Sequence, residues 1–195
     1  STRRWRWRRG IAEPSGFHLA QEFRRLLGGG GVDVETGAPL EPRDVREPAP
    51  KIGAPRRKEP VLLPVFNNER VRVRAATVAH GQFPALAFRI DAGGKTLVFS
   101  GDTNGNGDGL PALAADADLL VAHNALAEGA AGVERSLHMP PSVIGNIAQA
   151  ARTKQLVLSH RMLRTLGKEE ETLGAIRKAY GGPVAFADDL SCFHP

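Results

Sequence analysis

Cysteine is almost absent from this chain of 195 residues, because Cys192 is the only one. A single cysteine excludes an internal disulfide and fits a protein of a reducing compartment. Long apolar runs are also absent: none approaches the roughly 18 to 20 residues that a membrane-spanning helix needs, and no signal peptide is visible. These absences predict a soluble, cytoplasmic protein without membrane contact.

The positive charge is concentrated in one place. The formal net charge is +5, and five arginines alternate with Trp5 and Trp7 in the segment Arg3–Arg9. Arginine and tryptophan together suit phosphate binding and base stacking. A terminal charge run without hydrophobic periodicity is more typical of a solvated tail, so composition favours a basic tail at 1–10 over a nucleic-acid-binding arm.

Residues 11–60 combine a weak helical pattern at 11–27 with a proline-rich connection that contains few large apolar residues. From Val61 onward the pattern changes to short strands, predicted at 61–66, 71–78, 85–91 and 96–100. Alternating apolar residues and the polar turns Asn67–Asn68 and Gly93–Gly94 favour antiparallel hairpins. With 42% hydrophobic residues, the chain can bury one sizeable core.

Strands and helices alternate after residue 102. Helices are predicted at 110–115, 141–152 and 169–180, and strands at 118–122, 156–158 and 184–187. A meander followed by alternating strands and helices predicts an α/β fold with a mixed sheet and flanking helices. The expected organisation is a tail at 1–10, a helix and connection at 11–60, and one folded unit at 61–195.

Three predicted strands end in a side chain that can bind a metal. Asp102 follows one strand in a glycine-rich turn, and His80 and His160 end two others. Imidazole nitrogen and carboxylate oxygen are ligands that zinc and similar metals accept. The positions of the three residues therefore predict a metal site.

The region 61–195 carries five motifs that together resemble the second half of a metallo-β-lactamase-fold hydrolase of the ribonuclease Z-like branch. In chain order they are Val78-Ala-His-Gly-Gln-Phe-Pro84, Ser100-Gly-Asp-Thr103, Asp118-Leu-Leu-Val-Ala-His-Asn-Ala125, His138-Met-Pro-Pro141 and Leu156-Val-Leu-Ser-His160. The resemblance implies an αββα sandwich, of which this chain holds an incomplete C-terminal half. It also implies one or two zinc ions, with manganese or iron as alternatives.

By the family pattern, His80, Asp102 and His160 would be metal ligands, and Asp102 would bridge two ions. A metal-bound hydroxide would then attack the substrate. His138 would contact the scissile group or protonate the leaving group, and His123 stands where the family has an acidic residue that orients it. Since two close imidazoles lower each other's pKa, His138 is expected to be neutral at pH 7.

Two departures from the family limit the prediction. The family's His-X-His-X-Asp-His loop is absent, so the chain supplies only half of the metal site. The segment Ile90–Thr96 is a short hairpin where many ribonuclease Z enzymes carry a long arm that grips transfer RNA. Together with the histidine at position 123, the short hairpin favours metal-dependent hydrolysis of a smaller ester, lactone, sulfate or phosphodiester. RNA is a less favoured substrate, and a homodimer is an expected alternative to a monomer.

Simpler interpretations remain open for several residues. The chain as a whole could be a non-catalytic remnant or an interaction module that binds nucleic acid through its arginine-rich start. His138 could cap a helix, and His123 could be a hydrogen-bonded core histidine. The run Asn104–Gly109 has the composition of a calcium loop but lacks the terminal glutamate, so it is predicted to be a turn.

Overall fold

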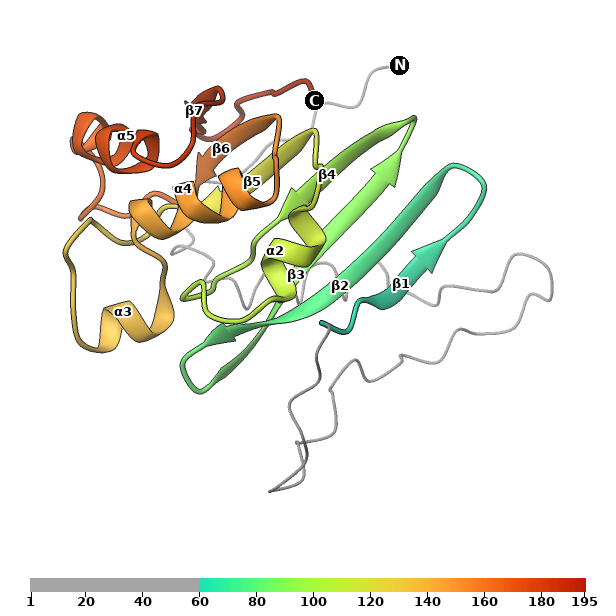
Figure 1. Cartoon of the computed structure of the whole chain (residues 1–195), viewed down its shortest axis with the longest axis horizontal. Helices are drawn as coiled ribbons and strands as arrows, with labels where there is room; N and C mark the ends of the chain where they lie inside the picture. The colour runs from blue at the N-terminus through green and yellow to red at the C-terminus, as the bar shows by residue number, and fades with distance from the viewer. Residues whose placement is uncertain (1–59) are drawn as a thin grey trace, which may run out of the picture. The chain divides into compact units, whose positions relative to one another are not determined.

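Seven strands form one mixed sheet in which each strand hydrogen-bonds its neighbour in the sequence (Figure 1). The computed structural model describes residues 60–195. The predicted basic tail, the helix at 11–27 and the proline-rich connection lie outside these residues. The strands are β1 (Leu63–Asn67), β2 (Val71–His80), β3 (Phe83–Ala92), β4 (Lys95–Phe99), β5 (Leu119–His123), β6 (Gln155–Ser159) and β7 (Val184–Phe186).

The first four strands form the predicted antiparallel meander. All ten residues of β2 pair with β3, and β3 pairs with β4 up to the turn at Gly93 and Gly94. Both turn residues have positive φ angles, +58° and +73°. A two-residue turn of this kind matches the twist of a hairpin, and glycine adopts it without steric strain. The predicted hairpin turn is therefore confirmed.

The strands from β4 to β7 pair in parallel, so each connection must cross back over the sheet. Helices α2 (Gly109–Ala114), α4 (Pro141–Ala150) and α5 (Glu169–Arg177) lie in these connections. Because β2 runs in the same direction as β4, the carboxyl ends of β2, β4, β5 and β6 share one edge of the sheet. The predicted metal ligands His80, Asp102 and His160 therefore lie at or near this edge.

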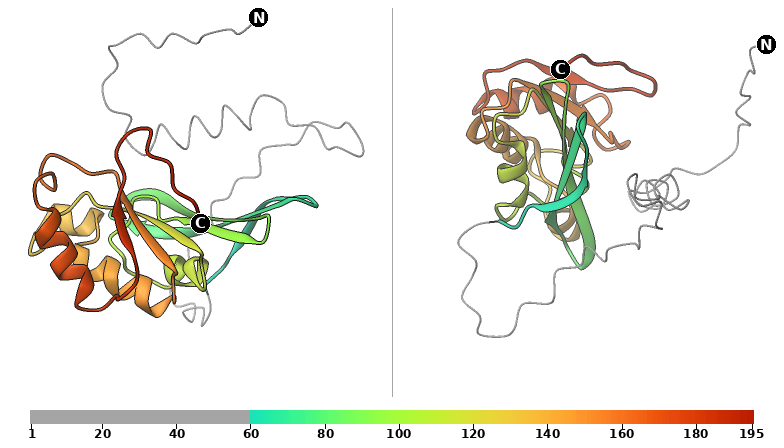
Figure 2. Two further views of the ribbon diagram at one scale, coloured as in Figure 1. Left: turned by 90° about the horizontal axis from the view of Figure 1, so that it is seen from above. Right: turned by 90° about the vertical axis from the view of Figure 1, so that its right-hand side faces the viewer.

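One face of the sheet carries the hydrophobic core. Helices α2, α4 and α5 contribute to the same buried cluster and lie on one side of the sheet (Figure 2). The strands contribute alternate residues, as expected when every second side chain points to one face. The core strand residues are Ala76, Ala87, Val98, Leu120, Ala122, Leu156 and Leu158.

The short helix α3 (Val133–Leu137) was not predicted from the sequence. None of its residues is buried, so it has no apolar periodicity to detect. The mixed sheet with flanking helices was predicted and is confirmed, and residues 60–195 supply one sheet and its helices. No helix within 60–195 is both long and apolar enough to span a bilayer.

Candidate active site

Four histidines and one aspartate meet at the shared edge of the sheet. His80 and His123 are the last residues of β2 and β5, and His160 directly follows β6. Asp102 lies three residues after the end of β4, and His138 follows α3. The five residues that were predicted as ligands or catalytic groups are thus brought to one region, although they come from distant parts of the chain.

His138 is the central ring of this cluster. Its ring centroid lies 5.2 Å from that of His80, 5.2 Å from that of His123 and 6.3 Å from that of His160. Three imidazoles therefore surround it. Burial lowers the pKa of His138, with Asp102 acting in the opposite sense. The ring is accordingly neutral at pH 7, and its Nδ1 is buried without a hydrogen-bond partner among residues 60–195.

The side chains of Asp102 and His160 face each other at the rim of the cluster. Nε2 of His160 lies 3.8 Å from Oδ1 of Asp102, which is too long for a direct hydrogen bond. Both side chains remain partly accessible to solvent, with exposed fractions of 39% for His160 and 21% for Asp102. This spacing leaves the imidazole nitrogen and the carboxylate oxygen available to a shared ligand.

His80 is oriented by the backbone of α3. Its Nδ1 lies 2.7 Å from the carbonyl oxygen of Leu137, and because a carbonyl only accepts hydrogen bonds, Nδ1 carries the proton. The lone pair is then on Nε2. Metal-binding histidines commonly hold their second nitrogen in this way, which fixes the tautomer and the ring orientation.

His123 is held by backbone groups on both ring nitrogens. Nδ1 lies 2.8 Å from the carbonyl oxygen of Gly101, and the amide of Met139 donates to Nε2 at 3.3 Å. Burial lowers the pKa of His123 from 6.5 to about 4, against an opposing effect of Asp102. His123 is therefore a neutral, hydrogen-bonded histidine that contacts the segment of His138 through the backbone of Met139.

The loop after β4 is a turn whose polar groups are used in internal contacts. The backbone amide of Asn104 donates to the carbonyl oxygen of Ala79, and its Nδ2 donates to the carbonyl oxygen of Ser136. Its Oδ1 accepts from the amide of Asn106. These contacts agree with the prediction of a turn for the run of calcium-like composition, and they tie the loop of Asp102 to β2 and α3.

The alternative role of His138 as a helix cap is realised only through its backbone. Its amide donates to the carbonyl oxygen of Glu134 and closes α3. At the start of α4 the N-cap residue is Pro140, and the amide of Ser142 donates to Oε2 of Glu128 at 2.9 Å. The imidazole of His138 is therefore not used as a cap.

Several residues that hold the strand-end loops in place were not predicted from the sequence. Arg164 contacts Glu134 of α3 and donates through Nε to the carbonyl oxygen of Ala125. Arg135 of α3 donates to the carbonyl oxygen of Asn104 at 2.8 Å. The only sequence signal for such contacts is an arginine near a predicted site. The partners of these arginines are mostly backbone oxygens, which every residue has.

The donor chemistry of the cluster fits a divalent cation, but the ligand set is incomplete. Among residues 60–195, no three His, Cys, Asp or Glu side chains are placed to hold one ion together. Asp102 and His160 are close enough for a cation to bind both, and the Nε2 lone pair of His80 is a third donor in the same cluster. A complete metal shell needs ligands beyond this set.

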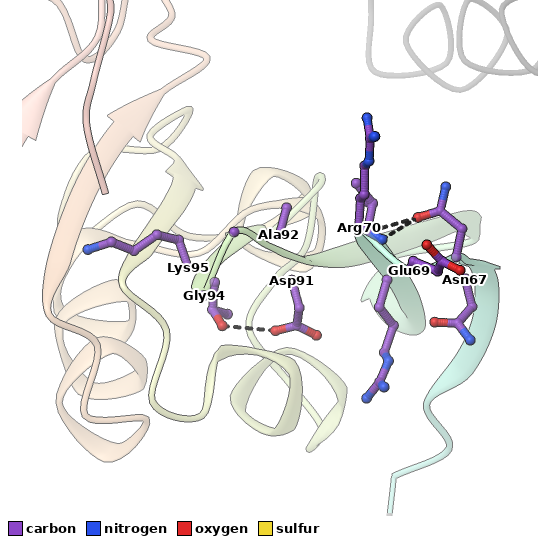
Figure 3. A pocket seen from close by; sticks show the side chains of 12 residues that line it. Asn67, Glu69, Arg70, Asp91, Ala92, Gly94 and Lys95 are labelled. Carbon is purple, nitrogen blue, oxygen red and sulfur yellow. Dashed lines mark hydrogen bonds between the residues drawn. The ribbon is translucent and has the colours of Figure 1, made fainter.

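A separate hollow of about 460 Å³ lies at the opposite end of the sheet, between the β1–β2 and β3–β4 turns (Figure 3). Arg70 and Lys95 line it but extend away from each other (Figure 3). His80 stands at the other end of β2, about 30 Å along the strand from Val71. The hollow is therefore distinct from the histidine cluster, and Arg70 and Lys95 do not converge on a ligand in it.

Comparison with known proteins identifies similar chains. Residues 32–161 match the model of a β-lactamase superfamily domain. The chain is similar to a ribonuclease Z from Methanosarcina mazei, with 35% identity over 98 residues, or 50% of this chain and 32% of that protein.

Two solved structures are also similar to this chain. The metallo-β-lactamase fold protein YhfI from Bacillus subtilis has a TM-score of 0.56 and 22% identity, over 64% of this chain and 49% of that one. The short form of human tRNase Z has a TM-score of 0.53 and 25% identity, over 67% of this chain and 45% of that one. This chain thus spans about a third of the ribonuclease Z and just under half of each solved structure.

Proposed function

This chain belongs to the β-lactamase superfamily, and on that basis we propose that it supplies half of the active site of a metal-dependent hydrolase. The resemblance to the ribonuclease Z-like branch, which the five motifs predicted, is confirmed by the matches to ribonuclease Z and tRNase Z. The observation that carries the proposal is the Asp102–His160 pair, 3.8 Å apart at the edge where the strands end.

The proposed metal ligands are Asp102 with His160 for one ion and Nε2 of His80 for a second ion, because no three such side chains within residues 60–195 are placed to hold one ion together. Zinc suits imidazole and carboxylate ligands, and manganese or iron are alternatives. When bound, the metal supplies Lewis acidity, which lowers the pKa of a coordinated water and polarises the substrate. The remaining ligands of each ion would come from outside residues 60–195 or from solvent.

His138 is the proposed proton-transfer group. It is neutral at pH 7, and its Nδ1 has no hydrogen-bond partner within residues 60–195. A neutral imidazole beside the reacting group can hydrogen-bond the scissile ester, or it can take a proton from the attacking water and then pass that proton to the leaving group. His123 would act indirectly, because both of its nitrogens are occupied and it holds the amide of Met139, the residue after His138.

The proposed substrate is a phosphodiester, with an ester, lactone or sulfate as alternatives. The relatives named ribonuclease Z and tRNase Z favour the phosphodiester. The two-residue turn between β3 and β4 leaves no room for a long substrate-gripping arm at that position, and this favours a smaller substrate than transfer RNA.

The test is tightly bound metal per chain, measured by elemental analysis after dialysis, for the wild type, Asp102→Ala and the control Asp116→Ala. Asp116 is an exposed carboxylate that pairs with Arg152, just beyond the end of α4. We expect near-stoichiometric metal in the wild type and control and its loss in Asp102→Ala. Turnover of a phosphodiester, ester, lactone and sulfate panel would follow. The proposal would be refuted if the wild type bound no metal and turned over none of these substrates, and if the same held for a protein that includes any upstream coding sequence.

A second candidate function is a non-catalytic interaction module. The incomplete ligand set within residues 60–195 favours it. The arginine-rich segment Arg3–Arg9, which lies outside the described residues, would then bind nucleic acid. Binding to RNA or DNA that persists after deletion of residues 1–10 would exclude that role for the segment.

A further inference from the structure

The backbone of His160 is held in a left-handed conformation. Its φ angle is +49°, a region that non-glycine residues enter at an energetic cost and occupy only when their surroundings impose it. This conformation occurs at the first residue after β6, where the chain turns so that the imidazole lies 3.8 Å from Asp102. Some neighbouring contact must therefore stabilise the turn.

The next residue, Arg161, has the required contacts. Its side chain is only 10% exposed, although arginine is usually a surface residue. The guanidinium donates to Glu169 at the start of α5 and to Oδ1 of Asp188 at 3.2 Å, after β7. It also lies over the ring of Phe186, 4.9 Å from the centroid. Two carboxylates and one aromatic ring thus fix a single side chain.

These partners belong to elements that are themselves anchored. Phe186 is in β7, and the amide of Ala187 donates to the carbonyl oxygen of Leu158 in β6 at 2.8 Å. Glu169 is the first residue of α5. The planar guanidinium can meet both carboxylates and stack on the ring at once, which a lysine ammonium cannot do. The contacts fix the residue that follows His160 from two sides.

We propose that Arg161 is a positioning residue, whose buried guanidinium holds His160 in its left-handed conformation so that the imidazole faces Asp102. The proposal rests on the proposed function, in which His160 is a metal ligand. The contacts of Arg161 within residues 60–195 include neither Asp102 nor the other histidines, so it acts through His160 alone. Its closest analogue is the outer group that orients a metal-binding side chain.

The test compares Arg161→Gln and Arg161→Lys with the matched control Arg152→Gln in the full chain. Arg152 also has a left-handed backbone, with φ +54°, and pairs with Asp116, but its side chain is 68% exposed. It precedes β6, whereas His160 follows that strand, so the control lies at the opposite end of β6. The first readout is the backbone order parameter and the Cα chemical shift of His160 by NMR without metal. The second is the dissociation constant for zinc, from competition with a chelator.

Arg161→Gln is expected to loosen the backbone of His160 and to weaken zinc binding by about 10- to 100-fold, as loss of an orienting group does. Arg161→Lys should fall between it and the wild type, since it keeps the charge and loses the planar fork. Arg152→Gln should leave both readouts within about twofold of the wild type, because its ion pair is exposed. Unchanged NMR parameters of His160 in folded Arg161→Gln would overturn the proposal.

Two further outcomes are a variant that does not fold and a wild type that binds no zinc. If Arg161→Gln does not fold, Asp188→Asn takes its place, because it removes one partner of Arg161 whose side chain is 82% exposed. It should shift the NMR parameters of His160 in the direction expected for Arg161→Gln, but by a smaller amount. An unchanged Asp188→Asn would then count against Arg161. If the wild type binds no zinc, the proposed function fails for this chain, while the NMR readout still decides the role of Arg161.

Discussion

Nδ1 of His80 hydrogen-bonds the carbonyl oxygen of Leu137 at 2.7 Å and so joins the end of β2 to the last residue of α3. Since α3 buries none of its residues, polar contacts of this kind are what hold it. The same ring leaves Nε2 free to bind a metal. One histidine therefore has a structural nitrogen and a functional nitrogen, and substitution can separate them.

The first prediction separates the two nitrogens of His80. In His80→Asn, the amide nitrogen takes the place of Nδ1 and can still donate to Leu137, whereas the Nε2 lone pair is lost. We expect its free energy of unfolding within about 1 kcal/mol of the wild type, and His80→Ala to lose about 1 to 3 kcal/mol because the carbonyl is left unpaired. Both variants should weaken metal binding. Equal destabilisation in urea unfolding would contradict the structural role of Nδ1.

The second prediction concerns the pH dependence of stability through His123. Its pKa falls from 6.5 to about 4 on folding, so the unfolded chain binds the proton more readily between these values. The contribution of neutral His123 to the free energy of unfolding is fully present above pH 6.5 and is lost as the pH falls toward 4. Between about pH 7.5 and about pH 5 this single group should lower the free energy of unfolding by about 2 kcal/mol.

His123→Asn is the matched variant for that measurement. Asparagine can still donate to the carbonyl oxygen of Gly101 but leaves the amide of Met139 unpaired, which costs about 1 to 3 kcal/mol at about pH 7.5. Because the titrating group is gone, acidification should destabilise the variant by less than it destabilises the wild type. Urea unfolding at both pH values gives the difference, and an equal loss in both proteins would show that His123 does not titrate as described.

The third prediction compares two glycines that both have positive φ. A Cβ added to Gly93 in the hairpin turn would meet no atom within 4 Å, whereas a Cβ on Gly101 would lie 2.3 Å from the carbonyl oxygen of Leu86. Gly93→Ala should therefore cost only the backbone strain, about 1 to 2 kcal/mol. Gly101→Ala adds a backbone clash beside Asp102 and should cost about 2 to 5 kcal/mol. Similar melting temperatures for the two variants would contradict this order.

The sequence predicts the strand-end residues of the site well and their detailed contacts poorly. His80, Asp102 and His160 were predictable because alternation or a short apolar run marks each strand, and each residue lies at or just after the end of one. The contacts of the His123 ring with Gly101 and Met139 were not, since both partners are backbone groups whose position depends on tertiary packing. For the same reason α3 was missed: with no buried side chain, it leaves no periodic pattern.

The contacts of Arg161 could not be predicted from the sequence either. Its partners are distant in the sequence, at Glu169, Phe186 and Asp188. A charged residue after a strand is expected from composition to be a solvated surface group, because arginine is mostly exposed. Only the parallel pairing of β6 with β7 brings the last two of these partners to it.

The last prediction separates metal binding from proton transfer. His138 lies at the centre of the ring cluster, yet it is not among the proposed ligands, and its buried Nδ1 has no hydrogen-bond partner in the described part of the chain. His138→Ala should therefore keep the metal content of the wild type while turnover of a phosphodiester falls by about 10²- to 10⁴-fold, the usual contribution of a general acid or base. Asp102→Ala should lose both. A loss of metal in His138→Ala would make His138 a ligand instead, and unchanged turnover would exclude it from proton transfer.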